Sequence, residues 1–205
     1  MALFITFEGC EGCGKSYQSR ELHKRLLAAN IPAVLTHEPG GTVLGENITK
    51  WIKWHKELAL SATGELLLFS ASRNQLCNDV IAPALSEGNV VVCDRFYDST
   101  IAYQGYGRGL DLNTIKPLNK LATGGLKPTL TILLDIPADC GLARKSKTRQ
   151  DRFEAEKVIF HEQVRQGYLQ LARSEPRRFF VVDALLSKKT IADIIWQKVS
   201  AIACV

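Results

Sequence analysis

The sequence predicts an α/β fold in which a five-stranded parallel sheet is surrounded by helices in a three-layer arrangement. Five short runs are apolar at nearly every position, which is typical of strands buried on both faces of a parallel sheet. Stretches with helical periodicity separate these runs, and that alternation favours parallel connections. A glycine-rich motif stands between the first run and the first helical stretch. The apolar runs span residues 3–7, 33–36, 89–93, 129–135 and 179–183.

The first helical stretch spans residues 16–29, where Leu22, Leu26 and Ala29 recur at a spacing that places them on one helix face. No internal repeat, low-complexity tract or linker-like segment interrupts the chain. Its 205 residues fit one domain over 1–205 with a full hydrophobic core. The remaining predicted helices span residues 64–87, 112–122, 138–145, 154–173 and 188–203.

The composition narrows the functional class. The chain is 46% hydrophobic, but no apolar run approaches the roughly 18 residues of a membrane span, so we expect no membrane partner. The net charge of +5 favours an anionic ligand and is too small to imply a nucleic-acid partner. The first residues lack the basic segment and cleavage site of a secretory signal. The six scattered cysteines predict reduced thiols and a cytoplasmic location.

The segment GCEGCGKS matches the phosphate-binding pattern G-x-x-x-x-G-K-[ST] of P-loop NTPases. It follows an apolar strand and opens a helix, so its backbone N–H groups and the helix N-terminus are placed to bind phosphate. Lys15 supplies a cation for the β- and γ-phosphates of ATP, and Ser16 supplies a hydroxyl for Mg²⁺. The predicted ATP-binding loop comprises Gly9, Cys10, Glu11, Gly12, Cys13, Gly14, Lys15 and Ser16.

The same segment contains a C-x-x-C spacing at Cys10 and Cys13, which raises the alternative of a redox dithiol or a metal site. A structural zinc site needs a second pair of ligands, and none has a suitable spacing. A thioredoxin-like motif does not require Gly-Lys-Ser after it. We therefore interpret the two cysteines as occupants of variable positions in a phosphate-binding loop.

A second candidate cluster lies at the end of the third apolar run, where Asp94 and Arg95 follow VVVC. In open α/β sheets, ligands bind outside the carboxyl ends of the parallel strands. Asp94 is placed to hold Mg²⁺ through water, and Arg95 is placed to bind a second phosphate group. The alternative is a surface ion pair between these neighbours.

A nucleobase pocket is predicted from Phe69 and Arg73, which share one helix face at a spacing of four residues. Phe69 offers a ring for stacking and Arg73 a hydrogen-bonding fork, because a buried arginine requires a partner. The alternative places Phe69 in the core and Arg73 in solvent. Further polar and loop residues suited to base and sugar recognition are Pro39 in HEPGGT, Thr100, Tyr103 and Gln104.

The segment RKSKTRQDR is almost free of apolar residues, which predicts a mobile basic lid over about residues 144–153. The variable positions of the P-loop contain no arginine, so the lid is a source of the cations that phosphoryl transfer requires. Arg149 and Arg152 are candidates for the catalytic cation, and Arg144 is a candidate ATP contact. The alternative is a solvated basic loop.

Taken in order, FEGCEGCGKS, HEPGGT, SASRNQ, DRFYDSTIAYQG and LKPTLTILLD resemble the bacterial thymidylate kinases, and the resemblance covers nearly the whole chain. It implies a five-stranded parallel sheet, a homodimer, and transfer of the γ-phosphate of ATP to dTMP with Mg²⁺. For the homodimer, we expect the interface on the helix predicted over 64–87.

The resemblance also implies roles for single residues. The lid, and not the P-loop, carries the catalytic cation, and VDA at 182–184 closes the adenine pocket. Two departures are His37, where arginine is frequent, and Tyr17, where serine or threonine is usual. The implied contacts with dTMP are Glu11 near the 3′-hydroxyl, Phe69 stacked on thymine, Arg73 at O4, Thr100 at N3, Arg95 on the acceptor phosphate and Tyr103 beside the 2′ position.

Two other functions fit parts of the pattern. One is a kinase for another nucleoside monophosphate or for a deoxynucleoside, against which Arg73, Thr100 and Tyr103 argue. The other is a nucleotide switch that is not a kinase. A switch requires the P-loop and Mg²⁺ but neither an acceptor site nor a basic lid, so the presence of both favours the kinase.

Overall fold

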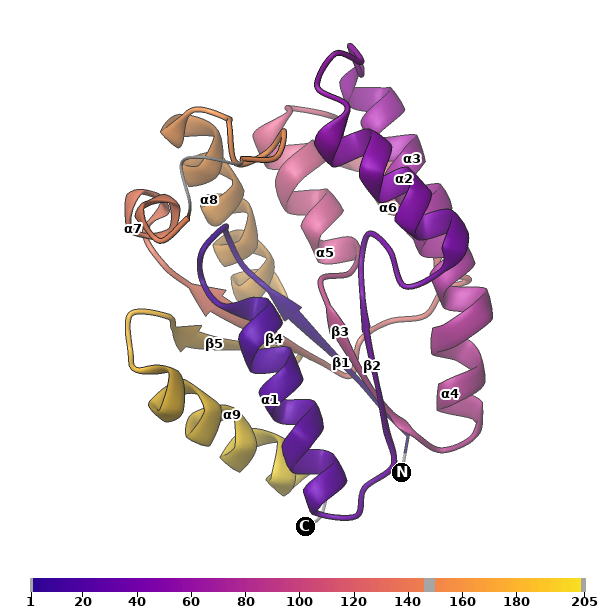
Figure 1. Ribbon diagram of the computed structural model, residues 1–205, viewed down its shortest axis with the longest axis vertical. Helices are drawn as coiled ribbons and strands as arrows, with labels where there is room; N and C mark the ends of the chain where they lie inside the picture. Colours follow the sequence, from indigo (N-terminus) through magenta and orange to yellow (C-terminus); the bar gives the residue numbers. More distant parts are fainter. Residues whose placement is uncertain (1, 146–149, 204–205) are drawn as a thin grey trace.

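The computed structural model describes residues 2–145 and 150–203, and its centre is one parallel sheet (Figure 1). The strands run in the order β2-β3-β1-β4-β5, and every pair of neighbours is parallel. All six residues of β1 are buried, which explains why its sequence does not alternate between apolar and polar residues. The strand bounds are β1 Leu3–Glu8, β2 Ala33–His37, β3 Val90–Asp94, β4 Leu130–Asp135 and β5 Phe179–Asp183.

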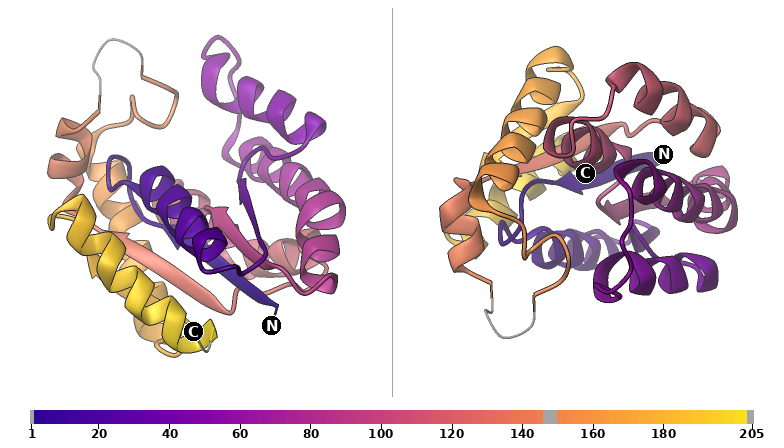
Figure 2. Two further views of the ribbon diagram at one scale, coloured as in Figure 1. Left: turned by 60° about the horizontal axis from the view of Figure 1, so that its bottom comes forward. Right: turned by 90° about the horizontal axis from the view of Figure 1, so that it is seen from above.

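Helices cover both faces of the sheet and give the predicted three layers (Figures 1 and 2). Helices α1 (Lys15–Ala28) and α9 (Lys188–Ala203) pack against each other on one face. The opposite face is covered by the segments that follow β2, β3 and β4, because connections between parallel strands are right-handed. These segments include α2 (Val43–Trp54), α3 (Ala62–Leu76), η1 (Cys77–Ile81), α4 (Ala82–Ser86), α5 (Tyr97–Thr100), η2 (Ile101–Gly107), α6 (Leu112–Ala122), α7 (Ala138–Ala143) and α8 (Val158–Ser174).

The five predicted strands are confirmed to within about one residue at each end, whereas two of the predicted helices need correction and two helical segments were missed. The helix predicted over 64–87 contains the π-helical turn η1. The helix predicted over 154–173 begins at 158, because the Asp151 carboxylate accepts hydrogen bonds from the N–H groups of Phe153 and Glu154 and forms a turn. Helix α2 and the helical residues 97–107 were not predicted.

Local sequence explains where two of the helices begin. Thr42 precedes α2 and accepts a hydrogen bond from the N–H of Gly45 at 3.0 Å. Ser61 precedes α3 and accepts from the N–H of Gly64 at 3.0 Å. Both residues are N-caps, which satisfy backbone donors that the first helical turn leaves unpaired. Among the described residues, no helix combines the length and the apolarity needed to cross a membrane.

Candidate active site

The predicted phosphate-binding loop joins β1 to α1 at the carboxyl edge of the sheet. Gly9, Gly12 and Gly14 have φ values of +139°, +72° and +97°. A Cβ atom on Gly9 would lie 2.4 Å from the carbonyl oxygen of Leu134, and one on Gly12 would lie 1.9 Å from that of Gly141. Side chains are therefore excluded at both positions, and the loop packs closely on β4 and α7.

Lys15 is buried and lies against this loop. Its ammonium donates hydrogen bonds to the carbonyl oxygens of Gly9 at 3.0 Å and Cys10 at 2.8 Å. The first turn of α1 and this cation together form a positive surface at the entrance to the helix, which is suited to phosphate oxygens.

The geometry argues against a dithiol at Cys10 and Cys13. Both cysteines are buried and free. Burial raises the pKa of the Cys10 thiol to about 12, so it stays protonated at neutral pH and is a poor nucleophile.

Ser16, in the first turn of α1, and Asp94, at the end of β3, are the two predicted Mg²⁺ ligands, and the structure brings them together. The Ser16 hydroxyl donates a hydrogen bond to the Asp94 carboxylate. This contact exists because β1 and β3 are neighbours in the sheet, so the segments after them meet at the same edge.

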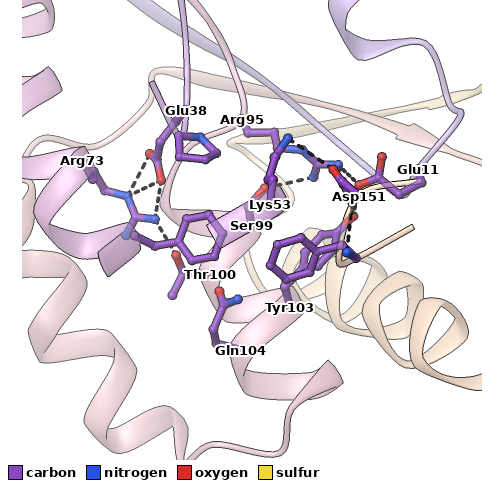
Figure 3. A pocket seen from close by; sticks show the side chains of 13 residues that line it. Glu11, Glu38, Lys53, Arg73, Arg95, Ser99, Thr100, Tyr103, Gln104 and Asp151 are labelled. Carbon is purple, nitrogen blue, oxygen red and sulfur yellow. Dashed lines mark hydrogen bonds and ion pairs between the residues drawn. The ribbon is translucent and has the colours of Figure 1, made fainter. Parts of the chain in front are cut away.

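Two adjoining cavities open at this edge. The small cavity lies between α3 and the α5–η2 segment (Figure 3). The large cavity is lined by the P-loop, the start of α1 and the predicted lid residues Arg144 and Lys145. Six residues line both cavities: Glu11, Glu38, Pro39, Lys53, Arg95 and Asp151.

Arg95 lies at the junction of the cavities and has a left-handed backbone, with φ of +71°. Its Nη2 donates to the Glu11 carboxylate at 2.7 Å and to the Tyr103 hydroxyl at 3.1 Å. Burial alone would raise the pKa of Glu11, but Arg95, Lys15 and Lys145 together hold it well below its usual value. The junction therefore carries a fixed carboxylate surrounded by cations.

The small cavity contains the predicted pair Phe69 and Arg73. The Arg73 side chain is 0% exposed, so the alternative of a solvated arginine is wrong. Its Nε donates to Glu38 at 2.8 Å, and Nη1 donates to Asn119 at 2.6 Å. Nη2 also donates to Glu38 and to the Thr100 hydroxyl. These contacts hold the guanidinium group rigidly against the wall of the cavity.

Thr100, Tyr103 and Gln104 also line the cavity, and Figure 3 shows them projecting from one helical segment. Phe153, which was not predicted, also lines the cavity, and its ring centroid lies 5.9 Å from that of Phe69. All predicted base-site residues thus meet at one cavity. The lining residues that sequence reasoning missed are Glu38, Lys53, Ser99, Asp151 and Phe153.

The structure separates the three predicted lid arginines. Arg144 lines the large cavity and donates to the carbonyl oxygen of Ala184 at 3.0 Å, which ties it to the 182–184 segment. Arg149 lies outside the described residues. Arg152 donates instead to three backbone carbonyl oxygens at the end of α2, on Ile52, His55 and Leu58. It lines neither cavity in this arrangement, and its catalytic role stays a prediction.

The two departures noted in the sequence have simple structural accounts. His37 is half exposed and lies 2.9 Å from the Glu46 carboxylate. Tyr17 is 41% exposed, and the Lys188 ammonium lies 4.9 Å from its ring centroid, so its extra bulk is accommodated at the surface.

Comparisons with known proteins agree with this geometry. A sequence model of the family described as thymidylate kinase matches residues 7–195. A thymidylate kinase from Dehalococcoides mccartyi is 53% identical over 202 residues, which cover 98% of each chain. One from Citrifermentans bemidjiense is 48% identical over 190 residues, covering 89% of this chain and 84% of that protein.

The fold is also shared with a solved structure. The crystal structure of thymidylate kinase from Ehrlichia chaffeensis superposes with a TM-score of 0.78 at 35% identity and covers 97% of this chain and 98% of that one. The family match and the identity of the relatives extend over the P-loop, both cavities and the lid. The chain therefore belongs to the thymidylate kinase family, whose members phosphorylate dTMP to dTDP with ATP as the phosphate donor.

Proposed function

We propose that the small cavity binds dTMP, that the large cavity binds the phosphates of ATP, and that the phosphoryl group is transferred where they meet. The observation that supports this assignment is the set of six lining residues shared by the two cavities. A donor at the P-loop and an acceptor in the small cavity would face each other across Arg95, as in-line transfer requires.

Ser16 and Asp94 are the proposed protein ligands of Mg²⁺. A hydroxyl and a carboxylate in hydrogen-bond contact are hard oxygen donors that fit this ion, which otherwise takes water and phosphate oxygens. When bound, the ion would offset negative charge on the β- and γ-phosphates. The protein itself contributes Lys15 on the donor side, so the loop both positions and neutralises the phosphates.

Lys53 and Arg95 are the proposed cations for the acceptor phosphate. Both line both cavities, and Figure 3 shows Lys53 near Arg95 and Asp151. The Lys53 ammonium lies 3.7 Å from the Asp151 carboxylate. Arg144 is proposed to contact ATP, and Arg149 keeps its proposed role as the lid cation.

Thymine is proposed to stack on Phe69 and to be read by Arg73, Thr100 and Gln104. Arg73 is a pure donor and suits the O4 carbonyl. The Tyr103 hydroxyl donates to Glu11 at 2.9 Å, which places a rigid ring and a carboxylate beside the expected sugar position. Pro39 completes the wall next to Glu38.

The test is ADP formation from Mg·ATP with dTMP, dUMP, CMP or no acceptor. The Arg95→Ala protein should lose at least roughly a hundredfold in kcat/KM for dTMP, because it lacks a positioned cation at the transferred group. dUMP should retain activity, since a missing methyl group costs only about 1–3 kcal/mol. Arg177→Ala, at an exposed position outside both cavities, is the matched control and should keep full activity.

Two outcomes would contradict the assignment. Arg95→Ala with unchanged kcat/KM would remove the junction from the reaction. Equal turnover of CMP and dTMP would remove the small cavity as the thymine site. Arg95→Lys keeps the charge and loses the forked guanidinium group, so its kcat/KM should lie between those of the wild type and Arg95→Ala. This variant also shows whether a loss in Arg95→Ala comes only from instability.

Assembly and location are also proposed. Large apolar side chains are exposed on α2, α3 and α6, which pack side by side, and they support a homodimer through this surface. The five cysteines in the described ranges are free, which supports a reducing compartment such as the cytoplasm.

A further inference from the structure

The buried carboxylate of Glu65 lies just outside the lining of the small cavity and contacts one of the lining residues. Glu65, on α3, is 2% exposed and does not line either cavity. Its Oε1 accepts a hydrogen bond from Nε2 of Gln104 at 2.7 Å. Gln104 is 2% exposed and lines the small cavity.

This contact fixes which end of the Gln104 amide faces the cavity. A primary amide has a donating NH₂ end and an accepting carbonyl end, and a half-turn exchanges them. A carboxylate only accepts, so the NH₂ end must face Glu65. The Arg108 guanidinium also donates a hydrogen bond to the Glu65 carboxylate, at 3.3 Å. The Gln104 carbonyl oxygen is therefore left for the cavity, and it has no hydrogen-bond partner among the described residues.

Arg73, which also lines the cavity, complements the Gln104 acceptor with hydrogen-bond donors. Arg73 can only donate, and four of its five N–H groups are used by Glu38, Asn119 and Thr100. The cavity thus presents an acceptor from Gln104 and a donor from Arg73. Thymine and uracil offer the matching N3–H donor and O4 acceptor, whereas cytosine offers an acceptor at N3 and a donor at its 4-amino group.

We propose that Glu65 is a specificity-determining positioning residue, which locks the Gln104 amide so that the site accepts thymine or uracil and rejects cytosine. The proposal rests on the assignment of the small cavity to dTMP. Glu65 acts through Gln104 and does not touch the substrate.

A merely structural role for Glu65 has to be separated from this one. Arg108 also pairs with Glu156 at 2.5 Å and stacks on Phe160, with 4.8 Å from the guanidinium carbon to the ring centroid. Removing Glu65 could loosen that packing, which would lower activity with every acceptor equally. The ratio of kcat/KM for dTMP to that for dCMP is insensitive to such a loss and sensitive to the amide orientation.

The experiment measures this ratio in Glu65→Gln. The neutral amide can donate as well as accept, so the Gln104 amide is free to turn. The dTMP to dCMP ratio should fall by at least roughly tenfold, about the value of one hydrogen bond to the base. The KM for ATP should stay unchanged. Glu156→Gln is the matched control, because it breaks the other Arg108 ion pair and leaves the Glu65–Gln104 contact intact.

A reciprocal variant tests the mechanism directly. Combining Glu65→Gln with Gln104→Glu puts the amide at position 65, outside the cavity lining, and the carboxylate at position 104, in the lining. This exchange restores a hydrogen-bond acceptor that faces the base. The double variant should recover most of the dTMP preference. If Glu65→Gln is too unstable to assay, the double variant and the shift of Tm by dTMP against dCMP decide the question.

The outcomes separate the two proposals. A wild-type ratio in Glu65→Gln, or an equal loss with both nucleotides, overturns the positioning role. If Gln104→Ala also leaves the ratio unchanged, the small cavity does not read the base and the site assignment fails with it. If Gln104→Ala collapses the ratio and Glu65→Gln does not, only the inference about Glu65 fails.

Discussion

Arg73 and Arg95 are guanidinium groups with low exposure whose carboxylate partners come from distant positions in the chain. Glu38 lies 35 residues from Arg73, and Glu11 lies 84 residues from Arg95. A buried charge is costly unless it is paired, so these pairs let the site carry cations in a fixed geometry. The proposed acceptor side of the site is thus organised by contacts within the protein itself.

Lys53 gives the first residue-scale prediction. Its side chain is 33% exposed, lies at the junction of the cavities and pairs only loosely with Asp151. Lys53→Met keeps most of the volume and removes the charge, so kcat/KM for dTMP should fall by about tenfold to a hundredfold, with little change in Tm. Steady-state kinetics with varied dTMP measure the effect.

Lys50→Met is the control for that experiment. Lys50 lies on the same helix, is exposed and lines neither cavity, so its substitution removes an equal charge at a short distance. A Lys53→Met protein within twofold of the Lys50→Met protein would contradict a role for Lys53 at the acceptor phosphate.

The residues of this site that could be predicted from the sequence are those whose pattern lies within one short segment. The P-loop pattern and the four-residue spacing of Phe69 and Arg73 lie within single segments, and the cavities contain them. Burial of Arg73 required a partner, but nothing local identifies Glu38 as that partner. Lys53 and Glu65 could not be found for the same reason, since only the packing of the helices brings Lys53 to the cavity and Glu65 into contact with Gln104 in its lining.

At the scale of elements, the strands were predictable because burial on both faces leaves an unbroken apolar run. Helix α2 was harder to see, because its first residues follow the glycines of the HEPGGT loop and Val43 is exposed. The helical α5–η2 segment was also not predicted, because the polar residues of its motif interrupt the apolar periodicity of a helix. Arg152 illustrates what a sequence pattern cannot predict. Its charge predicted a phosphate contact, but its guanidinium group donates hydrogen bonds to backbone carbonyl oxygens at the end of α2.

The end of β1 gives the element-scale prediction. Glu8 is fully buried and accepts hydrogen bonds from the Phe96 N–H and from the Ser99 and Tyr168 hydroxyls. Burial, together with the nearby Asp98, raises its pKa to about 7, although Arg95 opposes the shift. The folded protein therefore binds an extra proton between the unfolded value of 4.5 and about pH 7.

This shift makes stability fall as pH rises through that window. With about 1.4 kcal/mol per pH unit, Glu8 should account for a loss of up to about 3 kcal/mol between pH 4.5 and 7. In Glu8→Gln the amide can donate to the hydroxyls and accept from the Phe96 N–H, so the loss should disappear. Urea denaturation at several pH values measures it.

The measured quantity is the difference in unfolding free energy between the wild type and Glu8→Gln. Burial lowers the pKa of His161, so the effect of this residue on stability has the opposite sign and cancels in the difference. Glu175→Gln is the control, since the Arg178 hydrogen bond holds the pKa of Glu175 at about 2 and its titration lies below the window. Parallel stability curves for the wild type and Glu8→Gln from pH 5 to 8 would show that Glu8 is ionised throughout.

At the scale of the whole molecule, the helices that carry the proposed acceptor site also carry exposed apolar surface. Exposed fractions are 84% for Val43, 51% for Trp51, 54% for Leu67 and 75% for Leu121. These residues lie on α2, α3 and α6, and the first two of those helices contribute Lys53, Phe69 and Arg73. A second copy that covers this surface would therefore also restrain the residues proposed to bind dTMP.

Light scattering should give a mass of twice 22.7 kDa for the wild-type protein. Leu67→Glu should give the monomer mass, because a carboxylate cannot be buried in an apolar interface without a partner. The same variant should lose kcat/KM for dTMP more than affinity for ATP, since residues of α3 line the small cavity and none of them lines the large one. Leu185→Glu replaces a leucine that is 53% exposed in the turn after β5, and it should remain dimeric and active. A wild-type mass of 22.7 kDa would contradict the dimer, and a monomeric Leu67→Glu with full activity would show that the acceptor site is complete within one chain.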